Sequence, residues 1–405
     1  MKPIVRAGRM KPVHSDIRGP LFVEAMKRQK QGIDILKLNT GNPATFGFGL
    51  PDSIKNALIE HMQDGVGYCD FKGMPQARQA ICDYETSKGI NGITSDDVFI
   101  GNGVSEVVSF ALTPLLNDGD EVLVPSPSYS LWGNSVYLED GKPVFYTCDE
   151  QANWYPDIQD IRSKITDKTK AIVIINPNNP TGVLYPKEIL LEIIQIAREF
   201  GLLIFADEIY DRLVMDGKQH ISLASLTEDV PVITLNGLSK SHCLCGYRCG
   251  WMVISGPREL TEDYRQGIIQ LTSLRLCANT MAQIVIPAAL DDMDTPASMV
   301  RPGGRIYEQR EATVRELEKI NGLSFVKNDA AFYVFPKLDV KKFNITNDKQ
   351  FAHDLLDATN ILLVPGSGFD WKDPDHFRIV MLPQADILSD AIRRMGTFLD
   401  GYKQK

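Results

Sequence analysis

The sequence lacks the long apolar runs, the basic excess and the signal-peptide centre that mark several common classes of protein. No apolar run approaches the roughly 18 residues that a membrane-spanning helix needs, and the purest runs, such as 171–175, have the length of strands. Lysine and arginine number 43 against 52 acidic residues, so the formal charge of −9 leaves no overall basic surface for nucleic acid. The N-terminal stretch 1–14 has no apolar centre of the signal-peptide kind. These absences argue against membrane and nucleic-acid partners.

The cysteines do not form a disulfide framework either. The seven cysteines are odd in number and irregularly spaced, which is typical of reduced thiols in a cytoplasmic protein. Cys243, Cys245 and Cys249 with His242 do not have the spacing of a standard zinc site, so no metal is predicted. With 405 residues, 43% of them hydrophobic, the chain can bury a full core without disulfides or structural metal ions.

Short apolar runs alternate with helical patterns through the middle of the chain. Helical patterns are clearest at Val104–Leu116 and Pro186–Phe200, where Pro186 suits the first turn. Continuous apolar strands that alternate with helices predict an α/β fold with a mostly parallel, seven-stranded sheet covered on both faces. The seven apolar runs are Val98–Ile100, Glu121–Val124, Val144–Thr147, Ala171–Ile175, Leu202–Ala206, Val232–Leu235 and Trp251–Ile254.

The two ends of the chain have a different pattern, with helices and strands mixed as in an α+β domain. We expect residues 1–45 to join a smaller C-terminal domain at 286–405, with a large domain at 46–285 between them. Helices are predicted near 21–31, 52–63, 74–88, 304–320, 348–358 and 386–400, and strands near 323–327, 332–335, 362–364 and 377–381.

Four of the apolar runs end in polar turns, which is where open α/β sheets bind their ligands. The turn Gly101–Glu106 offers glycines and helix N–H groups to an anion, but its last residue is glutamate, which disfavours a nicotinamide-binding motif. The other three turns contain the amide side chains of 176–182, the carboxylate of Asp207 and the amine of Lys240. Arg248 follows Lys240 by eight residues. Each feature alone has an ordinary explanation, such as a tight turn, a helix N-cap or a solvated lysine. Together they fit pyridoxal phosphate, whose aldehyde needs a lysine, whose ring nitrogen needs a carboxylate and whose phosphate needs N–H groups and an arginine.

These turns carry a resemblance to a known family. The chain resembles the fold-type I, class I/II aminotransferases over nearly its whole length, from Gly41 to Arg378. Within that family it is most similar to bacterial alanine (glutamate–pyruvate) aminotransferases. The family motifs are 178–182 (NNPTG), 206–210 (ADEIY), Ser239-Lys240 and 246–250 (GYRCG), and the closer match is carried by 16–20 (DIRGP), 67–70 (GYCD) and 302–310 (PGGRIYEQR).

The resemblance implies a role for each site residue. Lys240 is expected to form the imine with the cofactor aldehyde and to act as the catalytic base, and Asp207 to keep the ring nitrogen protonated. The other expected cofactor contacts are Tyr210 and Asn179 on the ring hydroxyl, Tyr129 on the ring face, and Val104, Ser105, Ser239 and Arg248 on the phosphate, with Tyr68 reaching the phosphate of the second subunit of a homodimer. The expected substrate contacts are Arg378, Gly41 and Asn179 for the α-carboxylate and Arg18 for the second carboxylate of glutamate.

The sequence departs from its relatives at two positions. Many relatives have serine three residues before the lysine, where this chain has Gly237, and the alanine-specific ones often have an aromatic residue where this chain has Ser15. The resemblance implies a ping-pong transamination between L-alanine and 2-oxoglutarate, giving pyruvate and L-glutamate, in the amino-acid metabolism of the cytoplasm. Alternatives are an aminotransferase of other amino acids, a C–S β-lyase with the same cofactor, a non-catalytic cofactor-binding regulator and a dehydrogenase.

Overall fold

The middle of the chain forms one large sheet whose strand order is β2-β9-β8-β7-β6-β3-β4-β5 in the computed structural model, which describes residues 2–405. Strands β3, β4, β6, β7 and β8 run parallel, while β9 is antiparallel to its neighbours β8 and β2. The strands are β2 (Val98–Gly101), β3 (Glu121–Ser126), β4 (Lys142–Asp149), β5 (Tyr155–Pro156), β6 (Thr169–Ile175), β7 (Leu203–Asp207), β8 (Val232–Gly237) and β9 (Gly250–Ser255). The seven predicted strands are all present, so the fold class is confirmed. The additional β5 is a two-residue edge strand antiparallel to β4, too short to give an apolar run.

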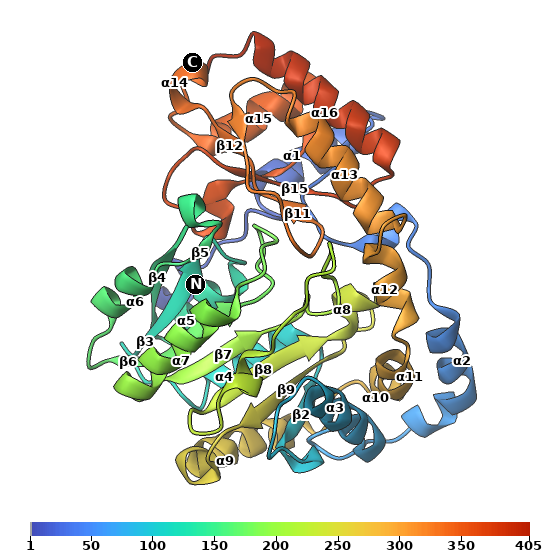
Figure 1. Cartoon of the computed structure of the whole chain (residues 1–405), viewed down its shortest axis with the longest axis vertical. Coiled ribbons are helices and arrows are strands. Elements are labelled where there is room, and N and C mark those ends of the chain that lie inside the picture. Colours follow the sequence, from blue (N-terminus) through green and yellow to red (C-terminus); the bar gives the residue numbers. More distant parts are fainter. Residues whose placement is uncertain (1) are drawn as a thin grey trace.

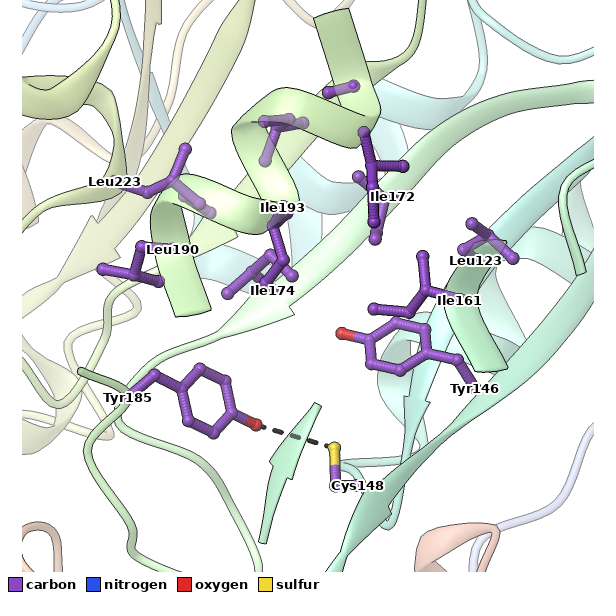
Figure 2. Close-up of a cluster of buried hydrophobic side chains, with 14 of the residues drawn as sticks. Leu123, Tyr146, Cys148, Ile161, Ile172, Ile174, Tyr185, Leu190, Ile193 and Leu223 are labelled. Atoms are coloured by element: carbon purple, nitrogen blue, oxygen red, sulfur yellow. Dashed lines mark hydrogen bonds between the residues drawn. The ribbon is translucent and has the colours of Figure 1, made fainter. Parts of the chain in front are cut away.

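Both faces of this sheet are buried because successive side chains of each strand point to opposite sides. In β6, Ile172 and Ile174 pack against helix α7 (Lys187–Phe200), and Figure 2 shows them facing Leu190 and Ile193 of that helix. The alternate residue Val173 belongs to the core on the other face, under α4 (Val104–Leu112), α5 (Leu131–Leu138) and α9 (Arg258–Arg275). The two cores fix the register of the strands, and with it the positions of the turns that follow them.

Two helix boundaries differ from the expectation. Helix α4 ends at Leu112 rather than at residue 116, because Pro114 has no N–H group and disfavours helix in the residue before it. Pro186 lies one residue before the first turn of α7, and Gly201 ends that helix with a left-handed backbone (φ 67°). The remaining helices of this part are α2 (Asp52–His61), α3 (Pro75–Ser87), α6 (Ile158–Lys164), α8 (Leu238–Ser241), α10 (Thr280–Ile284) and α11 (Ile286–Asp291).

The C-terminal elements form a second core, at the top of Figure 1, that includes part of the N-terminal segment. Strand β1 (Leu36–Lys37) pairs in parallel with β13 (Ile361–Leu362), and a three-stranded sheet has the order β11-β15-β14. The other elements are α1 (Pro20–Lys30), α12 (Asp294–Val300), α13 (Arg305–Leu317), β10 (Leu323–Ser324), β11 (Tyr333–Val334), β12 (Lys337–Leu338), α14 (Val340–Phe343), α15 (Asp348–Thr359), β14 (Val364–Pro365), β15 (Phe377–Val380) and α16 (Ala385–Asp400). The domain boundaries at residues 45 and 285 stay a prediction.

Among residues 2–405, no single helix has both the length and the apolar composition to cross a membrane. Helices α9 and α10–α11 meet that test only when they are taken together, and they are bent by 118° relative to each other.

Candidate active site

The predicted polar turns converge because β6, β7 and β8 are neighbours that run in the same direction. Asn176 follows β6, Asp207 is the last residue of β7, and Lys240 lies in the short helix α8 directly after β8. The carboxyl ends of all three strands therefore meet at one edge of the sheet. This edge faces the C-terminal core, from which Arg378 of β15 enters the same region.

Asp207 is a buried carboxylate, with 5% of its surface exposed. The indole Nε1 of Trp132 donates a hydrogen bond to its Oδ2 at 3.1 Å, and the backbone N–H of Ile209 donates to Oδ1 at 3.4 Å. Burial raises the pKa of Asp207 to about 6, although both hydrogen bonds lower it. At neutral pH the group is a largely ionised carboxylate that has few partners, so a cationic N–H group would be well matched to it.

Lys240 is hydrogen-bonded to the loop that contains Gly41. Its Nζ donates to the carbonyl oxygen of Gly41 at 2.9 Å and lies 3.9 Å from the sulfur of Cys245. Burial lowers the pKa of Lys240, but the phenol of Tyr333 and the thiol of Cys245 raise it by more. The pKa of Lys240 therefore lies above its ordinary value. Arg378 is the nearby cation that lowers the pKa of Lys240, and the phenol and thiol outweigh it.

The glycine-rich turn and Arg248 form a cradle of positive character. Gly103 precedes α4 with φ 86°, a conformation that favours glycine, and a Cβ at this position would collide with the guanidinium of Arg248. Val104 and Ser105 are the first two residues of α4, so their N–H groups have no partner within the helix. Together with the Arg248 guanidinium, they suit a phosphate group.

The glutamate that breaks the dinucleotide motif stabilises this same turn. Oε2 of Glu106 accepts a hydrogen bond from the backbone N–H of Asn102 at 2.7 Å, and Arg275 pairs with that oxygen at 2.5 Å. A glycine at position 106 would remove both contacts, which explains why the motif differs here.

Steric contacts explain why residue 237 is a glycine. A Cβ at this position would lie 2.6 Å from the carbonyl oxygen of Cys249 and 3.0 Å from the Cα of Gly250. The close approach of β8 to β9 thus excludes the serine that many relatives have, and Ser239 is the hydroxyl of this turn that remains for a phosphate contact.

Arg378 is a buried cation with a free donor. Its Nη1 donates to Oδ1 of Asn179 at 2.9 Å and its Nη2 to the carbonyl oxygen of Asn39, while its Nε has no partner among the described residues. The guanidinium lies 4.6 Å from the ring centroids of both Tyr333 and Phe369, and burial lowers its pKa. A buried, stacked guanidinium with an unpaired donor is suited to grip a carboxylate from solution.

Three further predicted residues are tyrosines, and they differ in how they relate to Lys240 and Arg378. The hydroxyls of Tyr210 and Tyr333 share a hydrogen bond at 3.0 Å. Tyr129 is half-buried, and its phenol raises the pKa of both Lys240 and Arg378. Tyr68 is different, because 83% of its surface is exposed.

Arg18 is exposed, on a segment that contacts the site indirectly. The neighbouring carbonyl of Ile17 accepts a hydrogen bond from Asn39 at 2.8 Å, and Asn39 in turn accepts from Arg378. His14 ties this segment to the C-terminal part of the chain, with Nε2 lying 3.0 Å from Oδ1 of Asp370, which follows β14. The guanidinium of Arg18 forms no ion pair among the described residues.

Sequence reasoning did not identify Trp132, Tyr333 or Asn39 as part of the site. Trp132 lies in α5, which has no strong helical pattern, and nothing in its sequence context distinguishes it from a core tryptophan. Tyr333 was placed correctly in a strand, but only the fold brings that strand beside Tyr210.

The donor set of this site fits a phosphorylated pyridine aldehyde. It comprises an amine on Lys240, a buried carboxylate on Asp207, and a glycine-lined helix start beside Arg248. The structure also has one group of side chains with the spacing of a metal site, formed by Glu208, Asp211 and His220. The Nζ of Lys88 contacts both of these carboxylates, at 2.8 and 3.2 Å, and supplies a positive charge there.

Comparisons with known proteins agree on one family. The family model described as aminotransferase class I and II matches residues 33–392. The glutamate-pyruvate aminotransferase AlaA of Haemophilus influenzae is 50% identical over 404 residues, covering all of both chains. The crystal structure of an aminotransferase from Escherichia coli superposes with a TM-score of 0.98 at 47% identity over the full length of both chains. An alanine aminotransferase from Pyrococcus furiosus has a TM-score of 0.93 at 41% identity, covering 98% of this chain and all of that one.

Proposed function

The chain belongs to the class I and II aminotransferase family, and we propose that it transfers the amino group between L-alanine and 2-oxoglutarate with pyridoxal 5′-phosphate as cofactor. Relatives at 45–50% identity across the whole chain are named alanine or glutamate-pyruvate aminotransferases, which supports these substrates. The observation that carries the proposal is the buried guanidinium of Arg378, with a free Nε, at the same edge of the sheet as Lys240 and Asp207.

The cofactor, when bound, supplies an aldehyde for the amino group and a cationic ring that withdraws electrons from the substrate α-carbon. The carboxylate of Asp207 holds the proton on the ring nitrogen, and Tyr210 and Asn179 hydrogen-bond the ring hydroxyl. Val104, Ser105, Ser239 and Arg248 bind the phosphate, and Tyr129 covers one face of the ring. The residues of the site thereby fix the orientation of the reacting group before the substrate enters.

Lys240 is the proton carrier of the reaction. Its Nζ would hold the cofactor through the aldehyde. With substrate in the site, the free amine of Lys240 would take the proton from the α-carbon of the substrate and return it, as a general base and acid. A ping-pong sequence follows, because pyruvate leaves before 2-oxoglutarate enters.

Arg378 and Arg18 select the substrates. The Arg378 guanidinium, with Asn179 and the backbone at Gly41, binds the α-carboxylate that every amino acid carries. Arg18 binds the second carboxylate of glutamate and 2-oxoglutarate, which alanine lacks. Because Arg18 lies on an exposed segment, it can move away when alanine is bound.

We further propose that the enzyme is a cytoplasmic homodimer. Tyr68 is exposed in the single chain, as is required of a residue that reaches the phosphate in a second subunit. The seven cysteines are free thiols, which supports a reducing compartment.

A coupled assay with purified enzyme tests the substrates. We expect turnover of L-alanine with 2-oxoglutarate, and a visible absorption band that L-alanine changes. In Lys240→Ala both the band and at least about 99% of the activity should be lost, since a positioned general base contributes about 10²–10⁴-fold. Full activity and an unchanged band in this variant would show that Lys240 has been assigned wrongly.

The same assay separates the alternatives. Fast turnover of an aromatic amino acid without turnover of alanine would assign another aminotransferase specificity. Release of pyruvate and ammonia from cystathionine, with no 2-oxo acid present, would instead assign a C–S β-lyase.

A further inference from the structure

A buried ion cluster lies directly behind the turn that carries Asp207 and Tyr210. It consists of Lys88 and three carboxylates, and we call it the Lys88 cluster. The Nζ of Lys88 lies 2.6 Å from Oε2 of Glu85, 2.8 Å from Oε2 of Glu208 and 3.2 Å from Oδ2 of Asp211. The three carboxylate residues are between 0% and 8% exposed. Such a cluster is costly to bury unless its charges are compensated and hydrogen-bonded.

The Lys88 cluster joins the two turns on which the cofactor site is built. Asp211 lies four residues after Asp207, and its Oδ2 accepts a hydrogen bond from the side-chain amide of Asn236 at 2.7 Å. Asn236 belongs to β8, four residues before Lys240. The same oxygen accepts from the hydroxyl of Tyr84 at 2.5 Å. One carboxylate therefore connects the turn after β7, the turn after β8 and helix α3.

Glu208 fixes the turn after β7 from the other side. Its Oε1 accepts hydrogen bonds from the hydroxyl of Ser222 at 2.8 Å and from the backbone N–H of Leu223 at 3.1 Å, while its Oε2 pairs with Lys88. The charge of Glu208 also raises the pKa of the adjacent Asp207. An unpaired Glu208 would thus act on both the position and the ionisation of the cofactor-binding carboxylate.

Lys88 is the cation that balances these carboxylates. Burial lowers the pKa of Lys88, but Glu208, Glu85 and Asp211 together raise it well above its ordinary value, so the amine stays charged. Burial lowers the pKa of His220, whose Nε2 donates to the carbonyl of Asn176 at 3.1 Å, so this imidazole is neutral at pH 7. The titratable and charged groups that face the cluster are Tyr84 and Glu85 of α3, Glu208, Asp211 and Arg212 after β7, His220, and His242 after α8.

We propose that Lys88 is a positioning residue for the transamination: its ammonium group holds the turns of Asp207 and Lys240 together and offsets the charges of Glu208 and Asp211 behind the cofactor. The cofactor part of this inference rests on the proposed function. Lys88 lies at the end of α3, and its side chain reaches the back of the site through the three carboxylates of the cluster, with its Nζ 5.0 Å from the ring centroid of Tyr84.

The test compares Lys88→Met with the wild-type enzyme. Four quantities are measured: the affinity of the cofactor-free chain for pyridoxal phosphate, the pH midpoint of the visible band, and kcat and KM for L-alanine. Removal of a positive charge favours protonated forms nearby, so the midpoint should move to higher pH by about one unit. We expect the cofactor affinity and kcat each to fall about tenfold or more, with KM within about twofold because the contacts of Arg378 are untouched. Lys88→Arg keeps the charge, so its midpoint should lie close to the wild-type value.

Two further variants make the outcome decisive. Arg265→Met breaks another buried ion pair, with Asp97 at 2.6 Å, at the edge of the sheet opposite the site. It should lower the melting temperature as Lys88→Met does, without moving the midpoint. Glu208→Gln removes a negative charge instead, so its midpoint should move to lower pH; this variant decides the question if Lys88→Met does not fold. An unchanged midpoint and affinity in Lys88→Met, equal shifts in Arg265→Met, or an upward shift in Glu208→Gln would overturn the role of Lys88.

The experiment also separates the two proposals. Wild-type protein that binds pyridoxal phosphate but does not turn over alanine overturns the proposed substrates, while the midpoints of the variants still decide the role of Lys88. Wild-type protein that takes up no pyridoxal phosphate overturns both.

Discussion

The burial of Asp207, which its proposed role requires, lowers the stability of the folded chain. Its pKa is raised from 3.8 to about 6 in the folded chain, chiefly by burial, so the ionised carboxylate is less stable in the fold than in the unfolded chain. A raised pKa of an acid makes folding less favourable at every pH above 3.8, and the cost is complete above about 6. A shift from 3.8 to about 6 corresponds to about 3 kcal/mol.

Asp207→Asn should therefore stabilise the cofactor-free chain while it inactivates the enzyme. The amide oxygen can still accept the hydrogen bond from Trp132, and no charge is buried. Thermal unfolding of the cofactor-free proteins should show no charge-related difference below pH 3.8, a gain that grows between pH 3.8 and 6, and a constant gain above. The activity with added cofactor should fall by about 100-fold or more. A variant less stable than wild type at pH 7.5 would contradict the electrostatic argument.

Arg378 offers a second test at the scale of one side chain. Arg378→Lys keeps a positive charge but loses the planar fork, the stacking on Tyr333 and Phe369, and the free Nε. We expect kcat/KM for L-alanine to fall about 10- to 100-fold, mainly through KM, because a charge-assisted hydrogen bond contributes about 1.5–3 kcal/mol. The visible band serves as the control and should be unchanged. If the band were lost and KM retained, Arg378 would belong to the cofactor site instead.

At the scale of helices and strands, the sequence predicted the sheet well because parallel strands buried on both faces are continuous apolar runs. The ends of those strands predicted where the polar groups would meet, as with Asp207 and Lys240. Short or amphipathic elements were less visible, such as β5 and helix α9, whose apolar residues give no clear run. Lys88 and Trp132 could not be assigned, because a charged or aromatic residue on a helix acquires its role only from the strands that the fold places behind it.

His14 is a titratable side chain that helps to hold the segment carrying Arg18, alongside the ion pair of Asp16 with Lys349 at 3.2 Å. His14 lies 3.0 Å from Asp370 and 3.6 Å from Asp16, and these carboxylates raise its pKa to about 9. Its backbone N–H also donates to the side-chain oxygen of Asn134 at 3.1 Å. Because the pKa in the fold exceeds the ordinary value of 6.5, the ionic contribution is complete below pH 6.5 and is lost as the pH rises through about 9.

His14→Gln should loosen this segment only at low and neutral pH. Cleavage by trypsin after the exposed Arg18 reports on it, and the ratio of the cleavage rates of variant and wild type cancels the pH dependence of the protease. We expect a ratio of several-fold at pH 6.5 that declines to about 1 above pH 9. A ratio that does not depend on pH would show that packing, rather than the charge of His14, holds the segment.

At the scale of the whole molecule, the exposed apolar surface around Tyr68 supports the proposed dimer. Val66, Tyr68 and Leu274 are between 76% and 83% exposed, and Thr280 ties the two segments together by donating to the carbonyl of Gly65 at 2.7 Å. Large exposed apolar side chains that cluster in this way mark interaction surfaces.

Tyr68→Phe should separate assembly from cofactor binding. The ring remains, so sedimentation at micromolar protein should show a dimer for both wild type and variant. The variant loses the hydroxyl that we propose reaches the phosphate of the other subunit, so the affinity for pyridoxal phosphate should fall about three- to tenfold. A wild-type chain that sediments as a monomer, or a variant with unchanged affinity, would contradict the shared site.

The pairing of β1 with β13 has a consequence for how the chain is made. Residues 36–37 leave the ribosome early, yet the strand that completes them lies at 361–362, more than three hundred residues later. The large sheet, whose strands span 98–255, can assemble in the meantime from partners already synthesised. Strand β1 therefore lacks its partner until residues 361–362 have been synthesised, and Gly41, just beyond that strand, contacts Lys240 in a segment whose anchoring completes late.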